Sequence, residues 1–142
     1  MTARIFTIAI ISILIGCAAV PPFDPNRLER EVLGASSRDA LQLEVLANGD
    51  IVFVEFAGGV KLWDSKSKRV ITLGRVPTYA KGEVGLLGFA VSPDYLKNGH
   101  LFALYCPEAK MDTMRVSRFT VKDDKMSVAS EDVLLAWDYD DE

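Results

Sequence analysis

The sequence predicts an all-β protein whose short strands are grouped in sets of four, as in the blades of a β-propeller. Short apolar runs separated by turn residues extend from Leu41 to Trp137. The pattern occurs twice, because NGDIVFVEF, which starts at Asn48, parallels NGHLFALYC, which starts at Asn98. The middle runs are apolar at successive positions, which fits strands buried on both faces between neighbouring sheets. The repeat therefore predicts about two blades.

The first sixteen residues are expected to direct export. Arg4 precedes an apolar run from Ile5 to Ile15, and this run is shorter than the ~20 residues that a spanning helix needs. The tetrapeptide Leu14-Ile15-Gly16-Cys17 resembles the lipobox of bacterial lipoproteins. The resemblance implies cleavage before Cys17, a diacylglycerol on its sulfur and anchoring to a membrane of the cell envelope, facing the periplasm or the exterior. The alternative is an ordinary signal peptide with a chance cysteine.

A tether is expected over residues 17–27, which are rich in proline. The next segment, Leu28–Gly34, leaves two interpretations open. Asp24 as N-cap, Pro25 in the first turn and Gly34 as a stop favour a short helix. The alternation of residue types along the segment favours a strand.

The first set of four strands begins after this segment. Asn48-Gly49-Asp50 predicts a tight hairpin turn, in which Gly49 supplies a positive φ. A glycine pair at Gly58 and a polar run after Trp63 mark the other two turns. The expected strands are Leu41–Ala47, Ile51–Phe56, Val60–Trp63 and Val70–Leu73.

The second set repeats the first, with Ser92-Pro93-Asp94 and Asn98-Gly99 between its first two strands. A propeller has at least about four blades of roughly 40 to 50 residues, so two blades leave their outward faces uncovered. We therefore expect the chain to be the front of a longer protein, a truncated product or gene fragment, or else to assemble from several copies. The expected strands are Leu86–Val91, Leu101–Tyr105, Met114–Val121 and Val133–Trp137.

Composition excludes several classes of function. Acidic residues outnumber basic ones by 20 to 16, which argues against a nucleic-acid partner. The two cysteines are too few for a disulfide scaffold, and Cys106 is expected to be a small buried apolar residue. His100 is the only histidine, which leaves little room for histidine-based catalysis or a multi-histidine metal site. In its turn, His100 is expected to be an exposed loop residue rather than a catalytic base.

Three segments together resemble one protein family. They are GEVGLLGFAVSPDY, from Gly82 to Tyr95; LEVLANGDIVFVEFAGGVKLWD, from Leu43 to Asp64; and RVSRFTV with ASEDVLLAW, from Arg115 to Trp137. They are similar to signatures of the glucose/sorbosone dehydrogenase family, the soluble quinoprotein sugar dehydrogenases. The resemblance extends from about Leu28 to Trp137, and it is specific because the segments occur in combination.

The resemblance implies a six-bladed propeller that binds pyrroloquinoline quinone (PQQ) with calcium on its axis and oxidises aldoses. It also implies that the segment near Leu28 is an outer strand that closes the last blade, which favours strand over helix. In the family, the catalytic base and the cations that hold the quinone follow the second blade. The chain itself is therefore expected to be inactive. The alternative, from a different class, is a non-catalytic, membrane-anchored propeller that serves as a binding module.

One family position falls within the chain. Glu83 matches the place where quinone-binding members have glutamine or glutamate, on the loop that leads into the innermost strand and faces the axis. A carboxylate there could accept a hydrogen bond from a sugar hydroxyl, and the nearby Gly82, Gly85 and Gly88 would allow close backbone approach. The alternative interpretation is a solvated loop glutamate. Glutamate instead of glutamine also adds negative charge beside an anionic cofactor.

Overall fold

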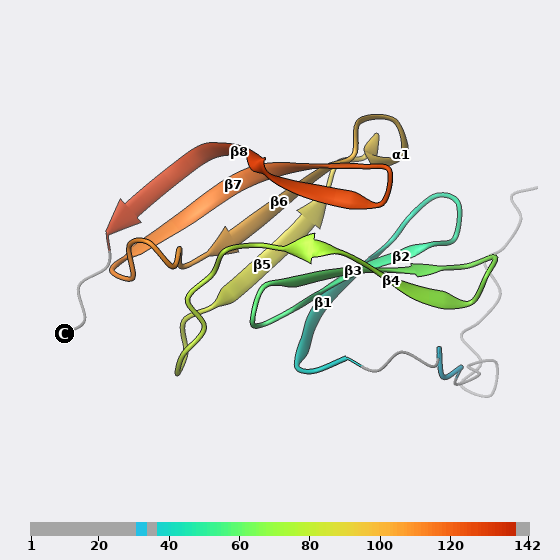
Figure 1. Cartoon of the computed structure of the whole chain (residues 1–142), viewed down its shortest axis with the longest axis horizontal. Helices are drawn as coiled ribbons and strands as arrows, with labels where there is room; N and C mark the ends of the chain where they lie inside the picture. The colour runs from blue at the N-terminus through green and yellow to red at the C-terminus, as the bar shows by residue number, and fades with distance from the viewer. Residues whose placement is uncertain (1–30, 34–36, 139–142) are drawn as a thin grey trace, which may run out of the picture. The chain divides into compact units, whose positions relative to one another are not determined.

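The computed structural model describes residues 31–33 and 37–138. Eight strands form two four-stranded antiparallel sheets, each with its strands in chain order (Figure 1). The sheets reproduce both predicted sets of four strands, and the all-β prediction is confirmed. The first sheet comprises β1 (Ala40–Val45), β2 (Ile51–Glu55), β3 (Gly59–Asp64) and β4 (Arg69–Arg75).

The second sheet differs from the prediction in two places. Its last strand is much longer than expected, and a four-residue helix follows the Ser92-Pro93-Asp94 break. The helix was missed because four residues are too few to show a helical period. The elements are β5 (Leu86–Val91), α1 (Tyr95–Asn98), β6 (His100–Tyr105), β7 (Thr113–Lys122) and β8 (Lys125–Asp138).

The two repeated glycines both adopt a positive φ. Gly49 has φ +86° in the turn between β1 and β2, as predicted. Gly99 has φ +64° and ends α1, where its N–H donates to the carbonyl of Tyr95. A Cβ at Gly99 would collide with the carbonyl oxygen of Val121. The parallel positions therefore share a backbone conformation but not a turn type.

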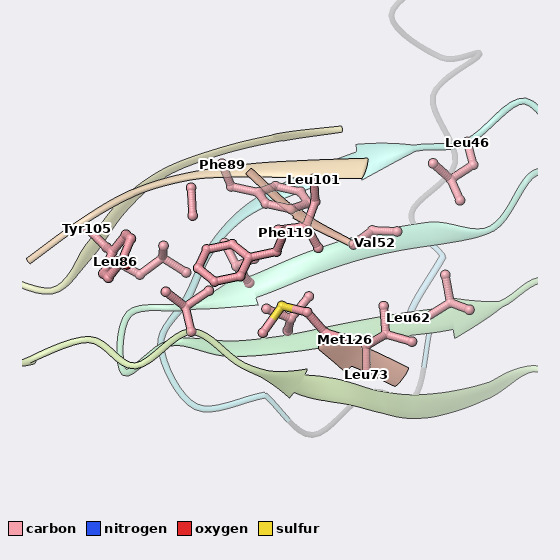
Figure 2. Close-up of a cluster of buried hydrophobic side chains, with 14 residues drawn as sticks. Leu46, Val52, Leu62, Leu73, Leu86, Phe89, Leu101, Tyr105, Phe119 and Met126 are labelled. Carbon is pink, nitrogen blue, oxygen red and sulfur yellow. The ribbon is translucent and has the colours of Figure 1, made fainter. Parts of the chain in front are cut away.

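The core lies between the two sheets (Figure 2). The first strands of the sheets, β1 and β5, are in contact, and so are the last strands, β4 and β8. The sheets thus pack face to face, as neighbouring blades do. The core cluster contains Leu46, Val52, Val54, Val60, Leu62, Leu73, Val76, Leu86, Phe89, Leu101, Ala103, Tyr105, Phe119 and Met126.

A glutamine side chain joins the two inner strands. Nε2 of Gln42 on β1 donates to the carbonyl of Phe89 on β5 at 2.6 Å, and the N–H of Phe89 donates to Oε1 of Gln42 at 3.1 Å. Since β5 is an edge strand, its outward backbone groups have no strand partner there. Gln42 supplies both hydrogen bonds from the neighbouring sheet.

Each sheet also has an outer face, turned away from the core. Residues directly opposite each other in antiparallel strands share a face, so the pairing register assigns both outer faces. That of the first sheet carries Leu43, Val45, Ile51, Phe53 and Trp63. That of the second sheet carries Phe102, Leu104, Val116, Leu135 and Trp137. The predicted burial on both faces is confirmed at Val52–Val54, whereas β6 alternates between buried and half-buried residues.

Several predictions lie outside the described residues. They concern the signal segment 1–16, Cys17, the tether 17–27 and most of the Leu28–Gly34 segment. In the parts of the chain that the structure describes, no helix has the length and apolar character needed to cross a membrane.

Candidate functional site

The connection between the sheets, residues 76–85, forms a braced stem on the second sheet. The N–H of Tyr79 and the hydroxyl of Thr78 both donate to the carbonyl of Cys106, each at 2.8 Å. The N–H of Glu108 donates to the carbonyl of Pro77 at 3.0 Å. Thr78 and Cys106 are fully buried, and Cys106 is the small buried residue that was predicted. The stem is therefore held like an additional short strand.

Glu83 lies in a tight turn beyond this stem. Lys81 and Val84 exchange backbone hydrogen bonds of 2.9 and 3.2 Å, which leaves Gly82 and Glu83 as the two central residues. Gly82 has φ +61°, and a glycine with positive φ at the first central position is typical of a type II′ turn. The Glu83 side chain is exposed to solvent at the tip of the turn. The geometry thus presents one carboxylate to solvent on a rigid support.

The three glycines around Glu83 have different surroundings. A Cβ at Gly85 would lie 2.6 Å from the Phe56 ring, and one at Gly88 would lie 3.2 Å from Cβ of Leu104. Both are therefore needed for packing within the protein. A Cβ at Gly82 would meet nothing within 4 Å. Of the three, only Gly82 leaves open space beside Glu83 that a ligand could occupy.

Arg75 braces the base of the stem. Its Nε donates to the carbonyl of Ala57 at 3.0 Å, and Nη2 donates to the carbonyl of Thr78 at 3.1 Å. Its Nη1 forms a 2.7 Å ion pair with Glu108. One guanidinium thus links three loops at the end of the sheets where Glu83 lies. Arg75 could not be predicted from the sequence, since nothing in its local pattern marks it.

His100 lies at the other end of β5. Glu83 precedes β5, whereas His100 is the first residue of β6. The expectation of an exposed loop residue was wrong for His100, because it pairs with Thr120 of β7 and is partly buried. Its backbone N–H donates to Oδ1 of Asn98 at 2.8 Å. A six-residue strand spans about 20 Å. Cavities of 460 and 480 Å³ near α1 also lie at this far end, lined in part by Tyr95 and Leu96. Glu83 and His100 therefore cannot act on one substrate atom.

A polar cluster on the core side of the second sheet was not anticipated. The hydroxyls of Tyr105 and Ser117 both donate to Oε1 of Glu131, the latter at 2.8 Å. Both hydroxyl residues are fully buried. Burial, followed by the bond to Glu131, raises the pKa of Tyr105 to about 12. The cluster thus joins β6, β7 and β8 through side-chain hydrogen bonds.

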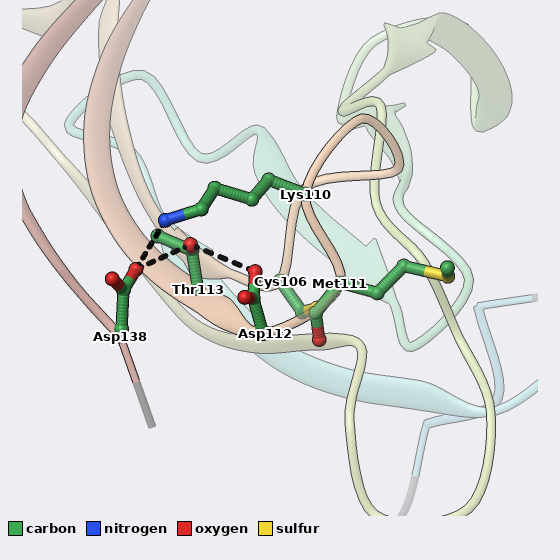
Figure 3. A network of polar contacts seen from close by, with 6 residues as sticks. All are labelled: Cys106, Lys110, Met111, Asp112, Thr113 and Asp138. Carbon is green, nitrogen blue, oxygen red and sulfur yellow. Dashed lines mark hydrogen bonds and ion pairs between the residues drawn. The ribbon is translucent and has the colours of Figure 1, made fainter. Parts of the chain in front are cut away.

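A second network fastens the end of β8 (Figure 3). Nζ of Lys110 and Oγ1 of Thr113 both donate to Oδ1 of Asp138, the latter at 2.8 Å. The bond from Lys110 is the main reason that the pKa of Asp138 lies below its usual value. Within residues 31–33 and 37–138, no group of three or more His, Cys, Asp or Glu side chains is placed to hold a metal.

Comparison with known proteins gives a family match and a shared fold. The family model for glucose/sorbosone dehydrogenase matches residues 38–140. The chain is similar to the PQQ-bound aldose sugar dehydrogenase of Streptomyces coelicolor, with 23% identity, a TM-score of 0.65, and coverage of 75% of this chain and 33% of that one. It is also similar to an oxidoreductase assigned as a glucose dehydrogenase from Thermus thermophilus, with 21% identity, a TM-score of 0.66, and coverage of 75% and 32%.

A third structure, described as a glucose dehydrogenase, gives 21% identity and a TM-score of 0.56, with coverage of 69% of this chain and 32% of that one. The chain thus spans about a third of the length of these solved structures. No curated protein matches it. The two four-stranded sheets correspond to blades of these dehydrogenases, which confirms the predicted propeller-type architecture.

Proposed function

Because the chain belongs to the glucose/sorbosone dehydrogenase family, we propose that it is the amino-terminal portion of a PQQ-dependent sugar dehydrogenase. The whole protein would oxidise a sugar (aldose) hydroxyl by hydride transfer to the quinone. The observation that carries this proposal is the family match over residues 38–140, which includes both sheets and the Glu83 turn. A PQQ-bound neighbour with the same fold supports the choice of cofactor.

In this proposal Glu83 contacts the sugar. Its carboxylate is an acceptor for a sugar hydroxyl, the braced stem fixes its position, and Gly82 leaves space beside it. The described residues of the turn do not by themselves fit PQQ. The quinone is anionic, and the turn offers one cation, Lys81, beside the negative charge of Glu83. We therefore assign the cationic contacts to PQQ, and the calcium ligands, to further blades of a longer chain.

The chain by itself is proposed to be inactive. Oxidation of a sugar hydroxyl needs a base that removes its proton. His100 cannot serve, because it lies at the opposite end of β5 from Glu83. The apolar outer faces of both sheets support the view that other blades complete the protein. Those blades would supply the base.

Two measurements test the proposed function. The chain is mixed with PQQ, calcium and glucose, and reduction of a redox dye is followed; we expect no turnover above buffer. Turnover would contradict the assignment of the base to a part beyond this chain. The coding sequence around the chain is then determined, and an encoded longer protein is assayed with Glu83→Gln and Glu83→Ala. We expect dye reduction by that protein and a KM for sugar raised by Glu83→Ala more than by Glu83→Gln.

Failure of the longer protein to bind PQQ would favour the alternative, a non-catalytic propeller that acts as a binding module. In that case the longer protein would have no enzymatic activity that Glu83→Ala could change. PQQ binding with an unchanged KM in both variants would instead remove Glu83 from the sugar site while the dehydrogenase assignment stands.

We further propose that lipid on Cys17 anchors the protein to a membrane of the cell envelope. The support is the sequence alone, where Leu14-Ile15-Gly16-Cys17 closes an apolar run of the length found in export signals. Metabolic labelling with a fatty-acid analogue in a bacterial host tests it. Labelling of the wild type and its loss in Cys17→Ser are expected. Equal labelling of both would refute the anchor.

A further inference from the structure

The Glu83 loop, which runs from Val76 to Leu86, is held at both ends by the first sheet. The N–H of Val76 donates to the carbonyl of Gly58 at 2.9 Å, and the N–H of Leu86 donates to the carbonyl of Phe56 at 3.0 Å. Both carbonyls belong to the turn between β2 and β3. A Cβ at Gly58 would collide with the carbonyl oxygen of Val76, so the turn and the loop fit without a gap.

Cys106 ties the same loop to the second sheet. Its carbonyl accepts from the N–H of Tyr79 at 2.8 Å, and its own N–H donates to the carbonyl of Gly85 at 3.1 Å. The backbone groups of one residue thus close the base of residues 79–85. The ends of compact loops of this length lie close together, so the tip moves with the base. The position of Glu83 therefore depends on how the base is held.

Arg75 holds this base with its side chain. Its guanidinium donates to the carbonyl of Thr78, next to the closed base, and to the carbonyl of Ala57 in the turn of the first sheet. The same group forms an ion pair with Glu108, which follows Cys106 by two residues. One planar group thus connects the loop, the first sheet and the second sheet. Three donors in fixed directions are a property of arginine that lysine lacks.

We propose that Arg75 is a positioning residue of the sugar site, which fixes Glu83 through the base of its loop and does not itself bind the sugar. The part of the inference that concerns sugar rests on the proposed function. The part that concerns the loop rests on the hydrogen bonds alone. The two parts are therefore tested separately.

The first test measures hydrogen exchange by mass spectrometry on the full 142-residue chain. Peptides that cover the Glu83 loop are compared in the wild type, Arg75→Ala and Arg75→Lys. The matched control is Arg118→Ala, because Arg118 is also partly exposed and pairs with Asp132 at 2.8 Å, within the second sheet. Peptides from β6 show whether each variant keeps its sheets.

We expect Arg75→Ala to speed exchange in the loop about tenfold or more, with β6 unchanged, because two hydrogen bonds and an ion pair are lost at its base. Arg75→Lys keeps the charge beside Glu108 but not both carbonyl bonds, so its effect should be smaller than that of Arg75→Ala. It also serves if Arg75→Ala does not fold. Arg118→Ala should exchange like the wild type in the loop.

The second test uses the longer protein of the proposed function. KM for sugar is measured in Arg75→Ala, Glu83→Ala and the double variant. Arg75→Ala should raise KM and leave PQQ binding unchanged. The double variant should have the KM of Glu83→Ala alone, because a residue that acts only through Glu83 has no effect once that carboxylate is removed.

Each test can fail by itself. Loop exchange that is unchanged in both Arg75 variants would overturn the inference, whatever the longer protein does. Effects of Arg75→Ala and Glu83→Ala on KM that add in the double variant would also overturn it, since Arg75 would then act by another route. Faster loop exchange together with a longer protein that binds no PQQ and oxidises no sugar would refute the proposed function and the role in a sugar site, and would confirm only the hold on the loop.

Discussion

The hydrogen bonds of Gln42 offer the sharpest test of how the two sheets are joined. One side chain serves both backbone groups of Phe89, at 2.6 Å for the carbonyl and 3.1 Å for the N–H. Phe89 is only 6% exposed, so water cannot easily replace these bonds. Gln42→Met keeps an unbranched side chain of similar length and removes both bonds. The substitution therefore separates hydrogen bonding from packing.

The magnitude follows from the two backbone groups that would lose their partner. Leaving a buried donor or acceptor unsatisfied costs about 1–3 kcal/mol. Because Gln42 itself is exposed and some solvent can reach the site, we expect the free energy of unfolding to fall by about 1–3 kcal/mol in total. This is a large share of the stability of a small domain.

Urea unfolding followed by tryptophan fluorescence measures the effect. Wild type, Gln42→Met and Thr72→Ala are compared at several protein concentrations, since self-association would raise apparent stability. Thr72 is an exposed strand residue on β4, so its variant should stay within about 0.5 kcal/mol of the wild type. A Gln42→Met variant equally close to the wild type would refute the argument that Gln42 holds the sheets together.

Three further predictions concern turns and pH. Asp124→Gly should raise the free energy of unfolding by about 0.5–1 kcal/mol in urea titrations, because Asp124 has φ +56° in a two-residue hairpin turn that favours glycine. Gly99→Ala should lower it by about 2 kcal/mol or more, since the added Cβ combines a strained φ with a collision against Val121; an unchanged midpoint would contradict that geometry. Burial alone would raise the pKa of Glu55, but hydrogen bonds led by that from Lys61 hold it below 4.5. A depressed folded-state pKa stabilises above the unfolded-state value, so stability should fall as the pH drops below about 4.5, and Glu55→Gln should flatten this part of the profile.

The strands could be predicted because their signals are local. Turn residues such as Gly49 and the apolar runs between them depend on neighbours in the chain, and β5 was placed to the residue. The same locality explains the misses. The four residues of α1 show no period, and the first half of β8 is polar and alternates weakly. α1 is ended by Gly99 in the left-handed conformation, and the first half of β8 is held by its pairing with the end of β7.

The candidate site, too, could be predicted from the sequence only in part. That Glu83 lies in a glycine-flanked loop before an inner strand is visible in the sequence. That Gly85 is occupied by packing against Phe56, whereas Gly82 faces open space, is not visible. Arg75 was missed for the same reason, because its three contacts come from separate loops.

The sequence by itself determined that this protein is a repeat of two four-stranded sheets from a sugar dehydrogenase family, since strand and turn signals act between residues close in the chain. Only the tertiary structure decided which face of each sheet is buried against the other and which stays open. When every residue of a strand is apolar, the sequence does not show which face of the strand is buried. The choice is made by partners such as Gln42 and Phe89, which lie 47 residues apart and meet only when the sheets pack.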